Sequence, residues 1–309
     1  MLSTVLNKAS RSGRARRAVE AVPITRKVVA RFVAGAEQAA ALEVARDAAA
    51  GGLATSLDIL GEGVSDIAGA RRTRDQYLAL LDALASAGAG PATEVSVKLS
   101  ALGQALPDRG HQVALDLAAE ICAAATAAGT MVTLDMEDHT TVDSTLAIAN
   151  ELRREHPRTG TVLQSNLRRT AGDIADLAAD PVRVRLVKGA YREPASVAYQ
   201  RKVEVDEAYR ADVARLMASR CYPMVATHDP AMIEVARRRA REEGRGASDW
   251  ELQMLYGVRG DLQTALVAEG HQVRVYVPFG EEWYPYFMRR LAERPANVAF
   301  FLKALARAS

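Results

Sequence analysis

A segment close to the carboxyl end of the chain joins two adjacent arginines to aromatic side chains. Residues 283–293 have the pattern of an amphipathic helix, and they follow a short apolar strand and a glycine turn. Four side chains spaced by three, four and seven residues share one face of this helix: Tyr286, Arg289, Arg290 and Glu293. Two guanidiniums beside aromatic rings form a planar, permanently charged receptor for a small carboxylate. A solvated arginine pair on a surface helix is the alternative, so the choice depends on the rest of the chain.

Polar residues recur where short apolar segments of the chain end. If those segments are parallel strands of a barrel, their carboxyl ends meet at one mouth, where barrel active sites lie. We therefore expect some of the following side chains to face a common cavity: Lys98, Asp135, Glu137, Gln164, Arg185, Lys188, Thr227, His228, Gln253 and Tyr276.

Strand parity separates two of these cations. Arg185 and Lys188 lie three positions apart, so a regular strand directs them to opposite faces. We predict that Arg185 points into the barrel and that Lys188 begins a loop. Gly189 in that loop permits close approach of the backbone to a ligand.

A cationic mouth of this kind is compatible with three chemistries. The first is a divalent metal site, but the surrounding positive charge opposes hard cations, so we expect no metal. Its ligands would be Asp135, Glu137, His139 and His228. The second is a Schiff base on Lys98 or Lys188, activated by neighbouring cations. The third is an anionic, electron-accepting cofactor beside a small carboxylate, with Arg185 stabilising the reduced cofactor.

Eight apolar segments alternate with longer helical patterns, many of them rich in alanine. This alternation indicates a parallel sheet, and eight repeats favour a closed (β/α)₈ barrel. An open doubly wound sheet is disfavoured, because the first strand is not followed by the full glycine-rich phosphate loop. The expected strands are Leu53–Leu60, Glu94–Leu99, Met131–Met136, Thr161–Gln164, Val182–Val187, Pro223–Thr227, Glu251–Leu255 and Val273–Val277. The expected helices include Asp66–Ser86, His111–Ala128, Glu193–Ser219, Pro230–Glu242 and the extra segment Asn297–Ala306. We expect residues 1–45 to form a helical extension and residues 46–309 to form the catalytic barrel.

The charge of the 309 residues is unevenly placed. Residues 1–35 hold eight basic residues against Glu20 alone, a charge of +7, so the remainder carries −5 of the total of +2. This basic N-terminal arm predicts either packing on the barrel or peripheral contact with an anionic membrane surface. It nearly lacks aromatic residues, so we expect no nucleic-acid partner. Cys122 and Cys221 lack metal spacing and suit free thiols in a reducing compartment, which indicates a cytoplasmic protein.

The strand-end segments together resemble the proline dehydrogenase family. The similarity runs from about residue 53 to residue 299, and its specificity comes from eight weak motifs in order on eight consecutive strands. The motifs are Leu57-Asp-Ile-Leu-Gly-Glu62, Val97-Lys-Leu-Ser-Ala-Leu102, Asp135-Met-Glu137, Leu163-Gln164, Arg185-Leu-Val-Lys-Gly-Ala-Tyr191, Ala226-Thr-His228, Glu251-Leu-Gln-Met-Leu-Tyr-Gly257 and residues 276–293.

This resemblance implies a distorted (β/α)₈ TIM-like barrel that holds FAD, with the last barrel helix over the barrel mouth. It implies oxidation of L-proline to Δ1-pyrroline-5-carboxylate by hydride transfer to flavin N5, with electrons passed to quinone. The implied substrate-binding residues are Lys98, Tyr276, Tyr286, Arg289, Arg290, Leu255 and Ala190. Asp135 and Arg185 match active-site positions, and the implied FAD contacts are Met136, Gln164, Arg185, Val187, Lys188, Gly189, Ala190, Thr227 and His228. Glu293 is expected to pair with an arginine or to lie near the flavin.

One position departs from the family pattern. Many members have an aromatic residue after the tyrosine that corresponds to Tyr191, where this chain has Arg192. The resemblance therefore does not say which residue makes the outer FAD contact at this position, but the expected reaction is the same. A Schiff-base lyase and a non-catalytic surface-binding protein are the competing functions, and the sequence favours no oligomeric state.

Overall fold

Eight parallel strands close into a barrel in the computed structural model, which describes residues 29–293, with side chains described as far as Arg290. The strands are β1 (Ala54–Ile59), β2 (Thr93–Lys98), β3 (Val132–Asp135), β4 (Gly160–Gln164), β5 (Arg183–Val187), β6 (Tyr222–Ala226), β7 (Glu251–Leu255) and β8 (Val273–Phe279). Each strand pairs with the next, and β8 pairs with β1 through Leu57 and Val277, among others. All eight expected strands are present, and no end differs from its expected position by more than two residues.

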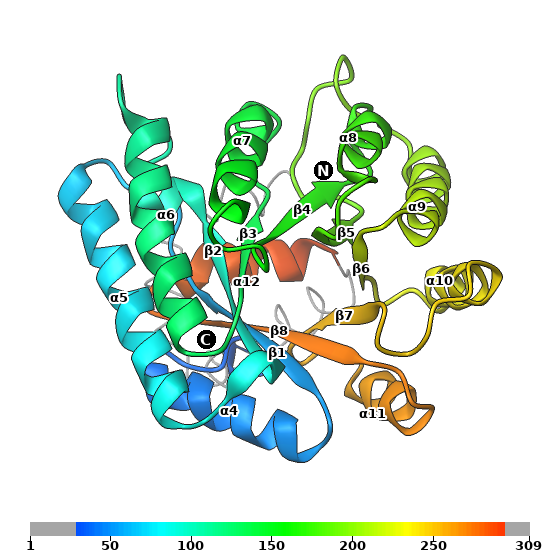
Figure 1. Ribbon diagram of the computed structural model, residues 1–309, viewed down its shortest axis with the longest axis horizontal. Helices are drawn as coiled ribbons and strands as arrows, with labels where there is room; N and C mark the ends of the chain where they lie inside the picture. The colour runs from blue at the N-terminus through cyan, green and yellow to red at the C-terminus, as the bar shows by residue number, and fades with distance from the viewer. Residues whose placement is uncertain (1–28, 294–309) are drawn as a thin grey trace, which may run out of the picture.

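Most helices form a ring outside the barrel (Figure 1). They are α4 (Gln38–Ala50), α5 (Ile67–Ser86), α6 (Gly110–Ala127), α7 (Val142–Arg153), α8 (Thr170–Leu177), α9 (Lys202–Ala218), α10 (Pro230–Glu242) and α11 (Gly260–Ala268). Short 3₁₀ turns, η1 (Gly90–Ala92) and η2 (Leu99–Leu102), flank β2. No helix among residues 29–293 is both long and apolar enough to span a bilayer.

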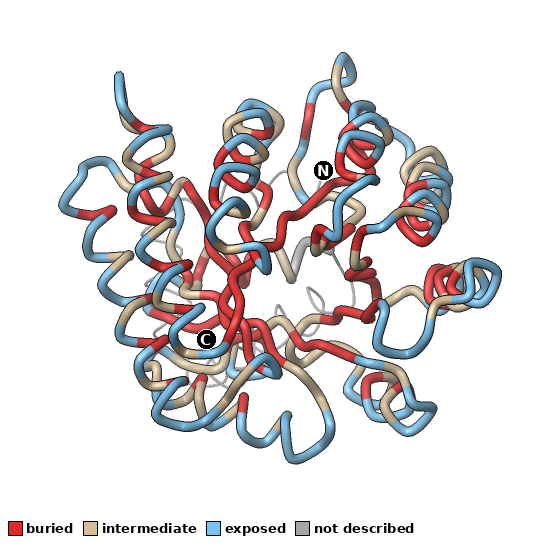
Figure 2. Tube along the Cα trace, viewed as in Figure 1, coloured by how far each residue is buried: buried red, intermediate tan, exposed pale blue. Residues whose placement is uncertain are grey.

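Local sequence explains where these helices begin and which face they bury. Asp66 caps α5 by accepting a hydrogen bond from Gly69 N at 2.6 Å, and Tyr77, Leu80 and Leu84 recur along its buried face. Alternate strand residues such as Val95, Val97, Val184 and Leu186 also lie in the apolar clusters between barrel and helices. Figure 2 accordingly shows continuous burial along the strands and striped burial along the helices.

One expected helix is shorter than predicted. The sequence predicts a helix over Glu193–Ser219, but α9 begins only at Lys202. Residues 193–201 instead pair with the loop after β4, where Arg168 N donates to Val197 O and Tyr199 N donates to Asn166 O. Pro194 disfavours helix in the preceding residue, which agrees with this outcome. The other expected segment, Asn297–Ala306, lies outside the described residues.

The helix α12 (Trp283–Glu293) does not join the outer ring. It crosses the end of the barrel inside the ring of helices (Figure 1), and Arg289 reaches Glu62, beyond the carboxyl end of β1. The last barrel helix therefore lies over the mouth, as expected.

Residues 29–35 fasten α12 to the barrel. Phe32 packs on Phe287 with ring centroids 6.4 Å apart, and Ala34 N donates to Pro278 O at 2.9 Å. Gly280 N in turn donates to Gly35 O at 2.8 Å. The expected boundary at residues 45/46 falls inside α4, so the division into two domains stays a prediction.

The barrel interior is polar, whereas barrel interiors are commonly filled by Val, Ile and Leu. Inward side chains hydrogen-bond with one another in layers: Glu94, Arg183, Glu251 and Arg274, then Ser56, Ser96, Arg185 and Gln253, then Asp58, Lys98, Asp135 and Tyr276 at the mouth. Glu94 is fully buried and lies 2.9 Å from Arg183, 3.1 Å from Arg185 and 3.9 Å from Arg274. Burial alone raises the pKa of Glu94, but Arg274, Arg183 and Arg185 outweigh it and lower this pKa to about 2.

We expect Glu94→Gln to lower the free energy of unfolding at neutral pH by about 3 kcal/mol, because three buried guanidiniums lose one carboxylate. The loss should shrink as pH falls. The stability that the Glu94 carboxylate contributes is fully present above its unfolded pKa of 4.5 and is lost as pH falls towards its folded pKa of about 2. Urea unfolding at several pH values measures both effects. Glu151→Gln, in an exposed pair with Arg154, is the control and should cost less than about 0.5 kcal/mol. An equal loss for both variants would contradict the role of Glu94.

Candidate functional site

Lys98 lies at the centre of the barrel mouth, at the end of β2. Its Nζ donates to Asp58 Oδ1 at 2.6 Å and lies 3.5 Å from Asp135 Oδ2 and 3.3 Å from the Tyr276 hydroxyl. Tyr276 OH donates to Asp135 Oδ2 at 2.7 Å. The ends of β1, β2, β3 and β8 thus bring together one ammonium, two carboxylates and a phenol.

Arg185 lies directly below this group and points into the barrel, as its strand parity predicts. Its Nε donates to Gln253 at 2.6 Å, and Nη1 donates to Ser96 at 2.8 Å and to Asp135 at 2.6 Å. Nη2 donates to Ser56 at 3.0 Å and to Glu94 at 3.1 Å. All five N–H groups of the guanidinium are therefore engaged, so its orientation is fixed. Its charge lies 5.3 Å from the centroid of the Tyr276 ring.

Charge at the mouth is set by burial and by these contacts. Burial lowers the pKa of Lys98, but Asp58, followed by Tyr276 and Asp135, outweighs it and raises this pKa well above its usual value. Lys98 is therefore an ammonium at neutral pH, which opposes its use as a Schiff-base nucleophile. Burial and then Asp135 raise the pKa of Tyr276 well above its usual value, so its hydroxyl stays protonated and can donate.

The helix α12 supplies two more cations above the mouth. Arg289 makes a two-point ion pair with both oxygens of Glu62, one at 3.2 Å. Burial lowers the pKa of Arg289, but Glu62 raises it by a larger amount, so the pKa lies above its usual value. The Arg290 guanidinium lies 5.2 Å from the centroid of the Tyr286 ring. The predicted pair is therefore half-buried at the mouth and not a solvated surface pair. The side chain of Glu293 lies outside the described residues.

The four residues of the metal alternative have separate partners. Glu137 accepts from Ser100 N at 3.0 Å and from Ser100 Oγ at 2.6 Å, and His139 contacts Glu193. His228 Nε2 accepts from Leu255 N at 2.8 Å. Between residues 29 and 293 no three His, Cys, Asp or Glu side chains gather in a way that could hold a metal ion.

Lys188 points away from the barrel interior, as its parity predicts. Its Nζ donates to Asp206 of α9 at 2.6 Å and to Asp229, the residue before α10, at 3.4 Å. The second Schiff-base candidate is thus directed away from Lys98 and Tyr276.

The ends of β4, β5 and β6 carry the residues predicted to contact FAD. Gln164 Nε2 donates to Glu137 O at 2.8 Å, and Thr227 Oγ1 accepts from Asp229 N at 3.1 Å. Met136 and Val187 belong to a small apolar cluster, whereas Ala190 is exposed. The predicted contacts therefore line one edge of the barrel with mixed polar and apolar groups.

An acceptor oxygen at this edge has no hydrogen-bond partner in the described part of the chain. It is Oδ1 of Asn166, which is buried beside Gly189. Gly189 has φ of +103°, and a Cβ there would lie 2.0 Å from Asn166 Oδ1. A bare glycine over a buried, unpaired acceptor suits a ligand that donates from hydroxyl or N–H groups, both of which FAD has. The residues present therefore fit this cofactor.

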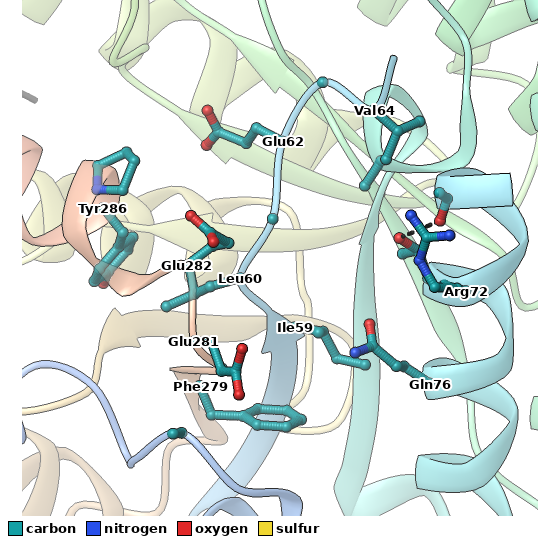
Figure 3. A pocket seen from close by; sticks show the side chains of 18 of the residues that line it. Ile59, Leu60, Glu62, Val64, Arg72, Gln76, Phe279, Glu281, Glu282 and Tyr286 are labelled. Carbon is teal, nitrogen blue, oxygen red and sulfur yellow. Dashed lines mark hydrogen bonds between the residues drawn. The ribbon is translucent and has the colours of Figure 1, made fainter. Parts of the chain in front are cut away.

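A cavity of about 760 Å³ lies on the opposite side of the mouth (Figure 3). Ile59 of β1 and Gln76 of α5 line one side, and Tyr286 of α12 lines the other. Of the predicted substrate residues, only Tyr286 and Arg289 reach it. The ion pair between Arg289 and Glu62 thus stands where this outer cavity meets the mouth.

The structure adds residues to which the sequence assigned no role. Glu62 and Asp58 lie in the motif at residues 57–62, but only the fold shows that they contact Arg289 and Lys98, respectively. Tyr191 is also near the mouth, and its pKa is raised by burial, followed by Glu62. Two signals were available for Asp58: it shares the parity of Ser56, and an inward lysine requires a counter-ion.

Comparison with known proteins identifies the relatives of this chain. Residues 41–303 match the family model described as "Proline dehydrogenase". A proline dehydrogenase of Deinococcus radiodurans is 43% identical over 279 residues, which is 89% of each chain. Proline dehydrogenase 2 of Bacillus subtilis strain 168 is 36% identical over 281 residues, 91% of each chain.

Solved structures share the same barrel. Proline utilization A (PutA) of Bdellovibrio bacteriovorus, inactivated by N-propargylglycine, superposes with a TM-score of 0.81 at 26% identity and covers 87% of this chain. PutA of Bradyrhizobium japonicum, in a D778Y mutant, gives 0.74 at 25% identity over 92%. This chain spans about a third of each PutA chain (33%), so it corresponds to one portion of those larger proteins.

We expect Gly189→Ala to reduce the flavin that copurifies with the protein and to cost about 2 kcal/mol of stability, because its φ is unfavourable and its Cβ would displace Asn166. The flavin-to-protein absorbance ratio and thermal unfolding measure both effects. Gly172→Ala, where no atom lies within 4 Å of the added Cβ, is the control and should leave both values unchanged or slightly improved. Wild-type flavin content in Gly189→Ala would argue against the cofactor edge.

Proposed function

This chain belongs to the proline dehydrogenase family, and we propose that its barrel mouth holds FAD and oxidises L-proline to Δ1-pyrroline-5-carboxylate. The observation that carries the proposal is the group formed by Lys98, Asp135, Arg185 and Tyr276 beneath the arginine pair of α12. A cationic clamp above a fixed polar floor suits a small amino acid held between a carboxylate receptor and a cofactor.

The substrate carboxylate would bind to Lys98, Arg289 and Arg290. Three cations around one carboxylate provide orientation as well as affinity. Arg289 already holds the carboxylate of Glu62 at two points, so a substrate carboxylate must compete with Glu62 or share the guanidinium with it. The arginine is thus charged and ordered before substrate arrives.

The proline ring would pack against aromatic and apolar walls. Tyr276 lies beside Lys98, with its hydroxyl fixed on Asp135, so its ring has one orientation. Tyr286 presents its ring from α12, while Leu255 ends β7 and Ala190 lies in the loop after β5. With its ring packed on these walls and its carboxylate bound by the cations, proline would have little freedom to move, which favours a reactive orientation.

FAD, when bound, would accept the hydride that leaves proline C5. The residues proposed to hold it are Met136, Gln164, Val187, Lys188, Gly189, Ala190, Thr227 and His228. Arg185 and Asp135 lie between this edge and Lys98, so a fixed positive charge would stabilise negative charge that develops at the mouth. The cations also disfavour the ammonium form of bound proline, and only the neutral amine can assist departure of the hydride.

Quinone is the proposed electron acceptor, and the basic N-terminal arm is the proposed contact with an anionic membrane. Lys8, Arg11 and Arg14 belong to residues 1–28 of the arm, which lie outside the described part of the chain, whereas residues 29–35 pack against α12 and β8. Sedimentation with anionic and neutral liposomes at low and high salt tests this contact. Absence of salt-sensitive binding would leave packing of the arm on the barrel as the alternative.

The visible spectrum of the purified protein tests the cofactor and the reaction together. A flavin spectrum that bleaches when L-proline is added without oxygen is the expected result. N-propargylglycine, which inactivates the Bdellovibrio PutA, should likewise block bleaching. A colourless protein that traps a carbonyl substrate with borohydride would instead support a Schiff-base lyase and would overturn the proposal.

We expect Arg290→Met to raise the KM for proline at least about tenfold while FAD content changes little, because one cation of the clamp is lost and the flavin edge is untouched. Steady-state kinetics and flavin absorbance measure these quantities. Arg259→Met, which removes an exposed arginine paired with Asp261, is the control. An unchanged KM in Arg290→Met would remove Arg290 from the clamp.

A further inference from the structure

Asp58 is a buried carboxylate that the proposed reaction does not yet use. It ends the inward face of β1, is 0% exposed, and lies 2.6 Å from Lys98 Nζ through Oδ1. Its other oxygen, Oδ2, accepts no hydrogen bond from any described residue. Burial raises the pKa of Asp58 and Lys98 lowers it, so the contact with Lys98 offsets part of the cost of burying this carboxylate.

Asp58 and Asp135 both face Lys98 but differ in their partners. Asp135 accepts from Arg185, Ser96 and Tyr276 at 2.6, 2.8 and 2.7 Å, and Lys98 is its most distant donor at 3.5 Å. Asp135 is therefore neutralised mainly by Arg185. Asp58 is the nearer carboxylate to Lys98, and Lys98 lowers its pKa more than its contact with Tyr276 does.

We propose that Asp58 is a positioning residue of the substrate site, which holds Lys98 as a charged ammonium where the substrate carboxylate binds. This role rests on the proposed function, because the carboxylate that Lys98 binds is that of the proposed substrate. Lysine is a compact charge on a flexible stem, so a buried lysine needs a fixed partner to stay charged and in place.

Charged and titratable groups from five other elements and two loops face this pair. They are Asp135 on β3, Arg185 on β5, Tyr276 on β8, Tyr77 on α5 and Arg289 on α12, with Glu137 after β3 and Tyr191 after β5. Burial is the largest influence on Lys98 and lowers its pKa, and Asp58 is the largest influence that raises it. We therefore expect loss of the Asp58 charge, with its 2.6 Å contact to Lys98, to lower the pKa of Lys98 more than loss of another contact at the mouth.

The test is the pH dependence of carboxylate binding in Asp58→Asn. The probe is cyclopentanecarboxylate, which has the five-membered ring and the carboxylate but no amine to titrate. In the wild-type holoenzyme Lys98 keeps its proton, so the dissociation constant measured by calorimetry should change little between about pH 6.5 and about pH 9. In Asp58→Asn the ammonium should lose its proton as pH rises, and binding should weaken by about tenfold over this range, equivalent to about 1.4 kcal/mol.

The control variant is Thr55→Val, on the same strand. It removes a buried hydrogen bond to Thr93 that does not involve Lys98, so it reports the effect of disturbing β1 alone. Its dissociation constant should follow that of the wild type at both pH values. Asp58→Ser provides the same readout if Asp58→Asn does not fold.

A double-mutant cycle with Lys98→Met separates positioning from general stability. If Asp58 acts through Lys98, Asp58→Asn should add no pH dependence to Lys98→Met, and the two effects on binding should be far from additive. Wild-type affinity in Asp58→Asn at both pH values, or additive effects in the cycle, would overturn the role of Asp58. Failure of the wild type to oxidise proline would instead overturn the proposed function, so the two failures are distinguishable.

Discussion

A single buried guanidinium organises the interior of this barrel. The five N–H groups of Arg185 reach side chains on β1, β2, β3 and β7, so one residue of β5 links five of the eight strands across the barrel interior. Because each contact leaves the guanidinium fewer orientations, the carboxylate of Asp135 is fixed in turn, and with it the Tyr276 hydroxyl. The mouth is therefore rigid because the floor beneath it is saturated with hydrogen bonds.

Much of the fold could be predicted from the sequence, because strands and helices leave periodic signals. The opposite orientations of Arg185 and Lys188 followed from parity alone. The start of α9 did not, because residues 193–201 pair with a segment near Asn166 that is distant in sequence. The position of α12 across the mouth depended on the family resemblance, since the helical pattern of residues 283–293 does not say where the helix packs.

The candidate site was predictable to a different degree for its cations and its anions. Arg289, Arg290 and Lys98 stand out in the sequence because their types suggest carboxylate binding. Glu62 does not, because an acidic residue after a strand is ordinarily solvated, and Asp58 could be placed only from its parity with Ser56 and the need of an inward lysine for a counter-ion. These ion pairs join residues that are distant in the sequence, so they become visible only in the folded barrel.

The contact between Gly257 and residue 31 joins distant parts of the sequence. A Cβ at Gly257 would lie 1.6 Å from Arg31 O, and Arg31 Nε donates to Gly257 O at 3.2 Å. The loop after β7 and the segment that packs on α12 are thus in direct backbone contact. Residues 29–35 therefore help to hold α12 over the barrel mouth, where the substrate site is proposed. A substitution among residues 29–35 is therefore expected to act on α12 much as a change within the barrel mouth would.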